Sequence, residues 1–136
     1  MNDREILQAL QTATTAAVAA SIMPALPVAY VDITFKVPID QKYLECVFIP
    51  NNNGGDFWGE EKNYRGIYRL ILHWPIDGKG PYAPMDLLAS IAAYFEKGKL
   101  LQGVQIYEKP DLTGVLREGG ESLFPATLRY QSFRQS

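Results

Sequence analysis

Apolar residues recur at helical spacing in two segments of the chain. Residues 3–21 carry an apolar stripe, and Pro24 and Pro27 follow it, where proline cannot continue the helical hydrogen-bond ladder. Residues 82–97 show the same period, and Pro84 falls in the first turn, where a missing N–H costs little. The pattern therefore predicts two helices.

Elsewhere, apolar and polar residues alternate with the period of a β-strand. The predicted strands are residues 43–49, 63–74, about 104–109 and about 122–133, with a short extended piece at 28–35. Pro38 and Asp40 indicate a turn, and residues 110–121 are expected to form a polar loop. This order predicts one α+β domain over residues 1–136, with a largely antiparallel or mixed β-sheet of four to five strands and two helices packed on one face.

The strand predicted at residues 63–74 has two unlike faces. The face expected to cover the core consists of Tyr64, Gly66, Tyr68, Leu70, Leu72 and Trp74. The opposite face alternates charge with bulky aliphatic residues and consists of Arg65, Ile67, Arg69, Ile71 and His73. A solvated face rarely holds two isoleucines at this spacing. A partner surface, or a helix packing there, would account for them better.

A loop rich in asparagine and glycine, residues 50–62, precedes that strand and is expected to be flexible. Its tip carries two aromatic residues, Phe57 and Trp58, followed by Glu60 and Glu61. Tryptophan often anchors protein contacts, although a single exposed aromatic residue needs no special explanation. We interpret the loop as a contact element and its acidic residues as solvated charges that could complement the basic strand face.

The composition offers little for catalysis. The formal net charge is −2, from 13 Lys and Arg against 15 Asp and Glu, which argues against a nucleic-acid-binding protein. One cysteine, Cys46, excludes an internal disulfide and is expected to fill the core. One histidine, His73, is expected to have a hydrogen-bonded structural role. No metal site, cofactor or nucleophile motif is therefore expected, and the chain is not expected to be an enzyme.

No segment has the pattern of a targeting signal or a membrane span. Residues 6–26 are rich in alanine, but glutamine and threonine interrupt the apolar run. We therefore expect a cytoplasmic protein that does not associate with a membrane.

Several segments resemble a bacteriophage family. They are "YRGIYRLILHWP" at 64–75, Gly80, "LLASIAAYFEKGKLLQGVQI" at 87–106 and a terminal strand containing Pro125. Together they resemble the tail terminator (minor tail protein U-like) proteins of long-tailed phages, over about residues 3–132. The asparagine-rich loop departs from the family pattern, and so does His73, which stands with Trp74 where smaller aliphatic residues are expected.

The resemblance implies an α+β subunit that forms a ring, typically a hexamer, at the head-proximal end of the tail in the virion. Such a ring caps the tail tube, stops its polymerisation and joins the tail tube protein to the head–tail connector protein. It carries no catalytic residues. DNA only passes through the lumen, and a mildly acidic subunit agrees with that passage because it repels phosphate.

Two other functions stay open from the sequence. Another connector or head-completion subunit would share a small α+β fold and ring assembly. A small-ligand-binding α+β enzyme would need a pocket with converging polar groups, which the residue pattern does not indicate.

Overall fold

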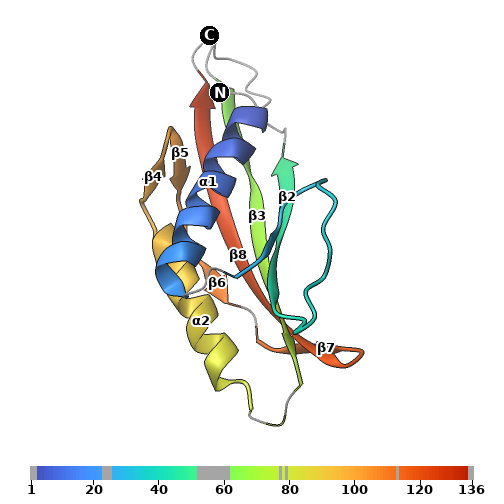
Figure 1. The fold of residues 1–136 in the computed structure, drawn as a ribbon. Coiled ribbons are helices and arrows are strands. Elements are labelled where there is room, and N and C mark those ends of the chain that lie inside the picture. Colours follow the sequence, from blue (N-terminus) through green and yellow to red (C-terminus); the bar gives the residue numbers. More distant parts are fainter. Residues whose placement is uncertain are drawn as a thin grey trace.

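Two helices cover one face of a single curled sheet (Figure 1). The computed structural model describes residues 3–22, 26–51, 62–76, 78, 80–112 and 114–134. The helices are α1 (Asp3–Ser21) and α2 (Tyr82–Ala92), and a short 3-10 helix, Ala93–Phe95, extends α2. The strands are β1 (Val28–Ala29), β2 (Tyr43–Asn51), β3 (Lys62–Pro75), β4 (Leu100–Leu101), β5 (Val104–Ile106), β6 (Asp111–Leu112), β7 (Leu116–Glu118) and β8 (Glu121–Arg134).

The sheet is organised around two long antiparallel strands. β3 and β8 pair over their whole lengths, from Lys62 opposite Arg134 to Pro75 opposite Glu121. The strand order is β1-β2-β3-β8-β5-β4, and β6 and β7 also pair with β8. Only β1 runs parallel to its neighbour, β2, among the pairs of described strands.

The α+β class and the two helices are confirmed, but the expected strand count was too low. The described residues form eight strands instead of four to five. Five of them, β1, β4, β5, β6 and β7, are only two or three residues long. Residues 110–121, expected to be a polar loop, contain β6, β7 and the first residue of β8. The segments at β6 and β7 are too short to show alternation, and they are strands because they pair with the long strand β8.

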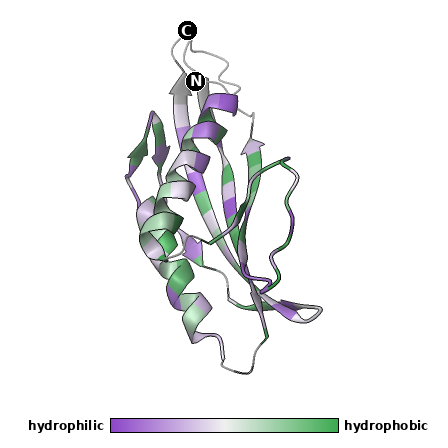
Figure 2. Ribbon diagram, in the orientation of Figure 1, coloured by the Kyte–Doolittle hydropathy of each residue, from purple (hydrophilic) through white to green (hydrophobic). Residues whose placement is uncertain are grey.

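The core lies between the helices and the inner face of the sheet. Figure 2 shows bands of hydrophobic and hydrophilic residues along the long strands, as a half-buried sheet requires. The predicted inward face of β3 is confirmed for Gly66, Tyr68, Leu70 and Leu72, which are buried. The Tyr68 hydroxyl shares a 2.8 Å hydrogen bond with the Thr14 hydroxyl, which joins α1 to the middle of the sheet.

Cys46 belongs to this core, as the sequence predicts. Its side chain is buried on the inner face of β2. Burial raises the pKa of the Cys46 thiol to about 11, because the thiolate loses its solvation, and the negative charge of Glu45 adds to this effect. The thiol is therefore a packing group in the folded chain.

We expect Cys46 to resist thiol reagents in the folded protein. With a pKa of about 11 instead of the ordinary 9.0, the thiolate fraction at pH 8 falls about a hundredfold. Labelling with a chromogenic disulfide at pH 8 should therefore be slow until denaturant unfolds the chain. The folded protein also holds the thiol proton more tightly than the unfolded chain does. This difference in pKa therefore favours the folded state fully below pH 9.0, and the advantage is lost as the pH rises towards 11. Rapid native labelling would contradict this burial.

Candidate subunit interface

The face of the sheet turned away from the helices is a mixed apolar and basic surface. We call it the outer sheet face; its members on β2, β3 and β8 are Val47, Ile49, Arg65, Ile67, Arg69, Ile71, Leu123, Pro125, Thr127, Arg129 and Gln131. Both described helices pack against the opposite face (Figure 1). In the described part of the chain, no helix therefore covers the two isoleucines of β3.

The structure brings the four predicted interface residues of β3 into one row. Arg65 is exposed, whereas Ile67, Arg69 and Ile71 are half-buried among side chains from the neighbouring strands. Strand register places Ile67 between Ile49 of β2 and Arg129 of β8. The other predicted contact residues, Phe57, Trp58, Glu60 and Glu61, lie outside the described residues.

The arginines of this face differ in their partners. The Arg129 Nε donates to Glu108 Oε2 at 3.2 Å. The Arg65 guanidinium lies 5.4 Å from the centre of the Tyr107 ring. The Arg69 Nε donates to the Thr127 hydroxyl at 3.3 Å, and no described carboxylate lies within ion-pair distance of Arg69. Arg69 is thus a half-buried cation without an anionic partner among the described residues.

A groove lies beside Arg69. It has a volume of about 240 Å³ and is lined by Arg69, Ile71, Leu116, Leu123, Pro125 and Thr127. One wall is Leu116 of β7, which pairs with Leu123 of β8 across a turn at Gly119 and Gly120. Sequence reasoning missed this groove because it treated residues 110–121 as loop. A Gly-Gly pair between two extended segments is a hairpin signal that would have indicated this wall of the groove.

His73 occupies one end of the same face and holds three strands together. Its Nε2 lies 2.7 Å from Glu45 Oε1 of β2, and its Nδ1 lies 3.1 Å from Glu121 Oε1 of β8. The ring also stacks on Tyr43 at 4.2 Å between centroids. These contacts fit the hydrogen-bonded structural role expected from the sequence.

Tyr43 belongs to the same cluster. Burial, followed by the negative charges of Glu121 and Glu45, raises the pKa of the Tyr43 hydroxyl, because each disfavours the phenolate. The cluster therefore keeps a neutral phenol stacked against His73 and fixes the start of β2 on β3.

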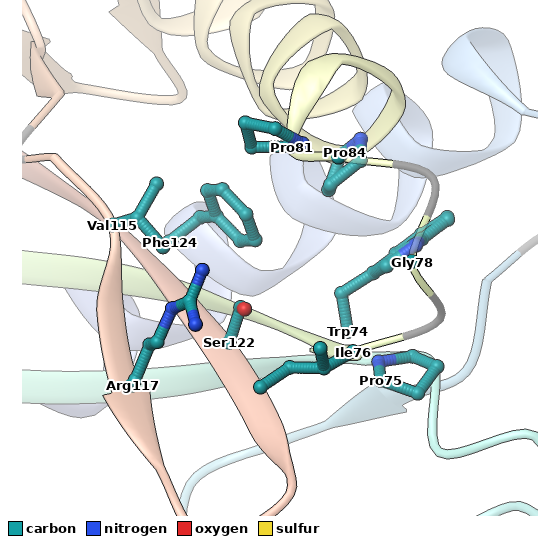
Figure 3. A pocket seen from close by; sticks show the side chains of 11 residues that line it. Trp74, Pro75, Ile76, Gly78, Pro81, Pro84, Val115, Arg117, Ser122 and Phe124 are labelled. Carbon is teal, nitrogen blue, oxygen red and sulfur yellow. The ribbon is translucent and has the colours of Figure 1, made fainter.

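A second cavity lies on the inner side of the sheet, at the start of α2. It has a volume of about 360 Å³, and Figure 3 shows Val115, Arg117 and Ser122 of the β7–β8 region together with Pro81 and Pro84 of the α2 region. Arg117 is the one ionisable side chain among its described lining residues. No described nucleophile and base converge there, so the cavity does not support a catalytic interpretation.

The described ranges contain neither a cluster of metal ligands nor a helix that could span a membrane. No group of three or more His, Cys, Asp or Glu side chains among these residues is arranged to hold a metal ion. No described helix is long and apolar enough to cross a membrane.

The fold is an α+β arrangement in which no described helix covers the outer sheet face. A family model described as phage tail terminator protein matches residues 5–130, and the chain therefore belongs to this family. The resemblance seen in the sequence is confirmed. Membership gives the protein a structural role in a phage tail and makes it a component of the virion.

A solved structure shares this fold. It is 23% identical to the chain, with a TM-score of 0.81, and the alignment covers 97% of this chain and 96% of that one. At this identity, the likeness shows the fold alone. No curated protein sequence matches the chain.

Proposed function

We propose that the protein is the subunit of a ring, a hexamer in the manner of its family, that terminates the tail tube. The ring caps the head-proximal end of the tube, stops its polymerisation and joins it to the head–tail connector. The observation that carries this proposal is the family match over residues 5–130. The outer sheet face, apolar and basic and without a covering helix among the described residues, supplies a surface for assembly.

The geometry of a ring agrees with this surface. A closed ring of identical subunits joins one patch to a different patch on the next subunit. Three strands of nine residues give roughly 400 Å² of flat sheet, at about 4.8 Å between strands and about 3.3 Å per residue. A standard interface buries roughly 800 Å² on each partner. The outer sheet face therefore supplies about half, and other segments must contribute.

The loop at residues 50–62 is one proposed contributor. Phe57 and Trp58 would give it apolar contact area, and Glu60 and Glu61 would give it charge opposite to Arg65 and Arg69. The proposal needs no cofactor and no catalytic residue. The formal net charge of −2 favours a lumen through which DNA slides without being held.

The experiment that tests this function combines mass and binding. Light scattering after size exclusion, over a range of concentrations and with negative-stain images, should show a closed ring with a central hole. Purified protein should bind the ends of isolated tail tubes and halt their growth. Binding to the necks of DNA-filled heads without binding to tube ends would instead indicate a connector subunit. A protein that neither assembles nor binds tube ends would contradict the proposal.

We expect the double variant Arg65→Glu with Arg69→Glu to lose ring formation while it keeps its fold. Both substitutions reverse a charge on the outer sheet face, and like charges facing each other across an interface cost several kcal/mol. The matched control is Arg4→Glu with Lys97→Glu, which makes the same charge change at exposed positions of the helical layer. Light scattering should show subunits for the first pair and rings for the control. Rings from both would mean that the outer sheet face is merely solvated.

A further inference from the structure

A turn before β2 presents an isoleucine entirely to solvent. Ile39 is 103% exposed, more than any other large hydrophobic residue described. The turn is nevertheless held by two hydrogen bonds, from the Gln41 N–H to the Pro38 carbonyl at 3.0 Å and from the Lys42 N–H to Asp40 Oδ1 at 3.1 Å. Ile39 therefore stands as a fixed apolar projection.

The segment that leads to this turn carries further exposed apolar residues. Ile33 is 62% exposed and Val37 is 51% exposed. Residues 30–42 pair with no described strand and run along the β2 side of the sheet (Figure 1). Several exposed apolar residues without a described covering element mark a contact surface more strongly than a single exposed side chain does.

The groove beside Arg69 has the complementary chemistry. Its lining is mainly aliphatic, from Ile71, Leu116 and Leu123 with Pro125, and its volume is about 240 Å³. A cavity of roughly 150 Å³ already admits a benzene molecule, so a four-carbon side chain fits. Arg69 at the groove has no carboxylate partner among the described residues. A ligand for this groove should be an aliphatic side chain with a carboxylate next to it.

Ile39 and Asp40 form such a pair. We propose that Ile39 of one copy of this chain enters the groove of a second copy and that Asp40 then faces Arg69. The contact cannot lie within one copy in the conformation described, because a fully exposed Ile39 touches no groove of its own chain. This inference rests on the proposed assembly of identical subunits and identifies one contact that joins them.

Four single variants test the contact. Ile39→Ala shortens the projection at a fully exposed position. Asp40→Asn keeps the oxygen that holds the turn but removes the charge. Asp40→Arg and Arg69→Asp each place two like charges together across the contact. The quantity to measure is the protein concentration at which half of the subunits are assembled. We expect Ile39→Ala and Asp40→Asn to raise this concentration severalfold, and the two charge reversals to raise it at least tenfold.

Mixing the two charge-reversed proteins gives the decisive result. In an equimolar mixture, the arginine introduced at position 40 of one variant meets the aspartate introduced at position 69 of the other. At the next contact around the ring, the native Asp40 of the second variant meets the native Arg69 of the first. We expect the mixture to assemble like the wild type at concentrations where neither variant assembles alone. Circular dichroism and unfolding midpoints should show that each variant is folded on its own.

The outcomes separate this contact from the proposed function. If the wild type forms rings and all four variants form them equally well, the contact is wrong and the ring remains. If the charge reversals fail alone and also fail when mixed, the two residues do not meet and the inference is overturned. If the wild type neither assembles nor binds tube ends, the proposed function fails first, and the contact fails with it.

Discussion

Replacing Tyr68 by alanine should cost roughly 3–5 kcal/mol of the free energy of unfolding, the range measured for large aromatic side chains removed from cores. Tyr68 is 0% exposed in the middle of β3, and its ring lies 6.5 Å from that of Phe95 between centroids. The substitution would leave a cavity where the helical layer meets the sheet. Because the whole stability of such a domain is roughly 5–15 kcal/mol, the variant should be marginally folded.

The matched control is Tyr68→Phe, which keeps the ring and removes the hydroxyl. It should cost only about 1 kcal/mol, because Thr14 loses its 2.8 Å bond to Tyr68 but still donates to the Leu10 carbonyl at 2.8 Å. Urea unfolding followed by circular dichroism measures both differences. Equal costs for the two variants would mean that the hydroxyl bond, and not the packing of the ring, holds α1 on the sheet.

The position of Tyr68 in the core could be predicted from the sequence, and so could most of the large elements. α1 and the long strands carry many repeats of their period, so each pattern is readable without its neighbours. The short strands could not be predicted in this way. β6 exists because Asp111 and Leu112 lie opposite Thr127 and Ala126, a relation between segments distant in the chain.

The candidate interface could likewise be predicted only in part from the sequence. The alternation along β3 places Arg65, Ile67, Arg69 and Ile71 on one face, and the structure agrees. The groove beside Arg69 could not be read from that strand, because its far wall comes from Leu116. The environment of His73 also depends on register, since Glu45 and Glu121 reach it from two other strands.

Gly66 occupies a position where register leaves no room for a side chain. A Cβ at this residue would lie 2.7 Å from the Ile49 carbonyl oxygen and even closer to the Tyr130 hydroxyl. Contacts under 3.0 Å force some atom to move. The carbonyl belongs to the paired backbone of β2 and cannot shift cheaply, whereas the Tyr130 hydroxyl is the end of a side chain. Gly66 is therefore required by close packing between β2, β3 and the Tyr130 ring.

We expect Gly66→Ala to destabilise the fold by roughly 1–3 kcal/mol, the range for overpacking in a core. Tyr130→Phe alone should be neutral or slightly stabilising, because its buried hydroxyl has no hydrogen-bond partner among the described residues. The double variant should recover part of the loss, since phenylalanine removes the atom nearest to the new methyl group. Recovery should be incomplete because the Ile49 carbonyl oxygen and the Tyr130 ring carbon Cζ, each 2.7 Å from the added Cβ, both remain.

The wild type, the two single variants and the double variant form a double-mutant cycle. Urea unfolding of these four proteins gives the coupling free energy between positions 66 and 130. A coupling of roughly 0.5–3 kcal/mol in favour of the double variant is the expected result for residues in direct contact. If the two effects simply add, the Tyr130 hydroxyl is not what the methyl group meets, and the cost arises from the β2 backbone or from the ring that both side chains share. If Tyr130→Phe alone is strongly destabilising, the hydroxyl has a partner outside the described residues, and the close packing around Gly66 also secures a polar contact.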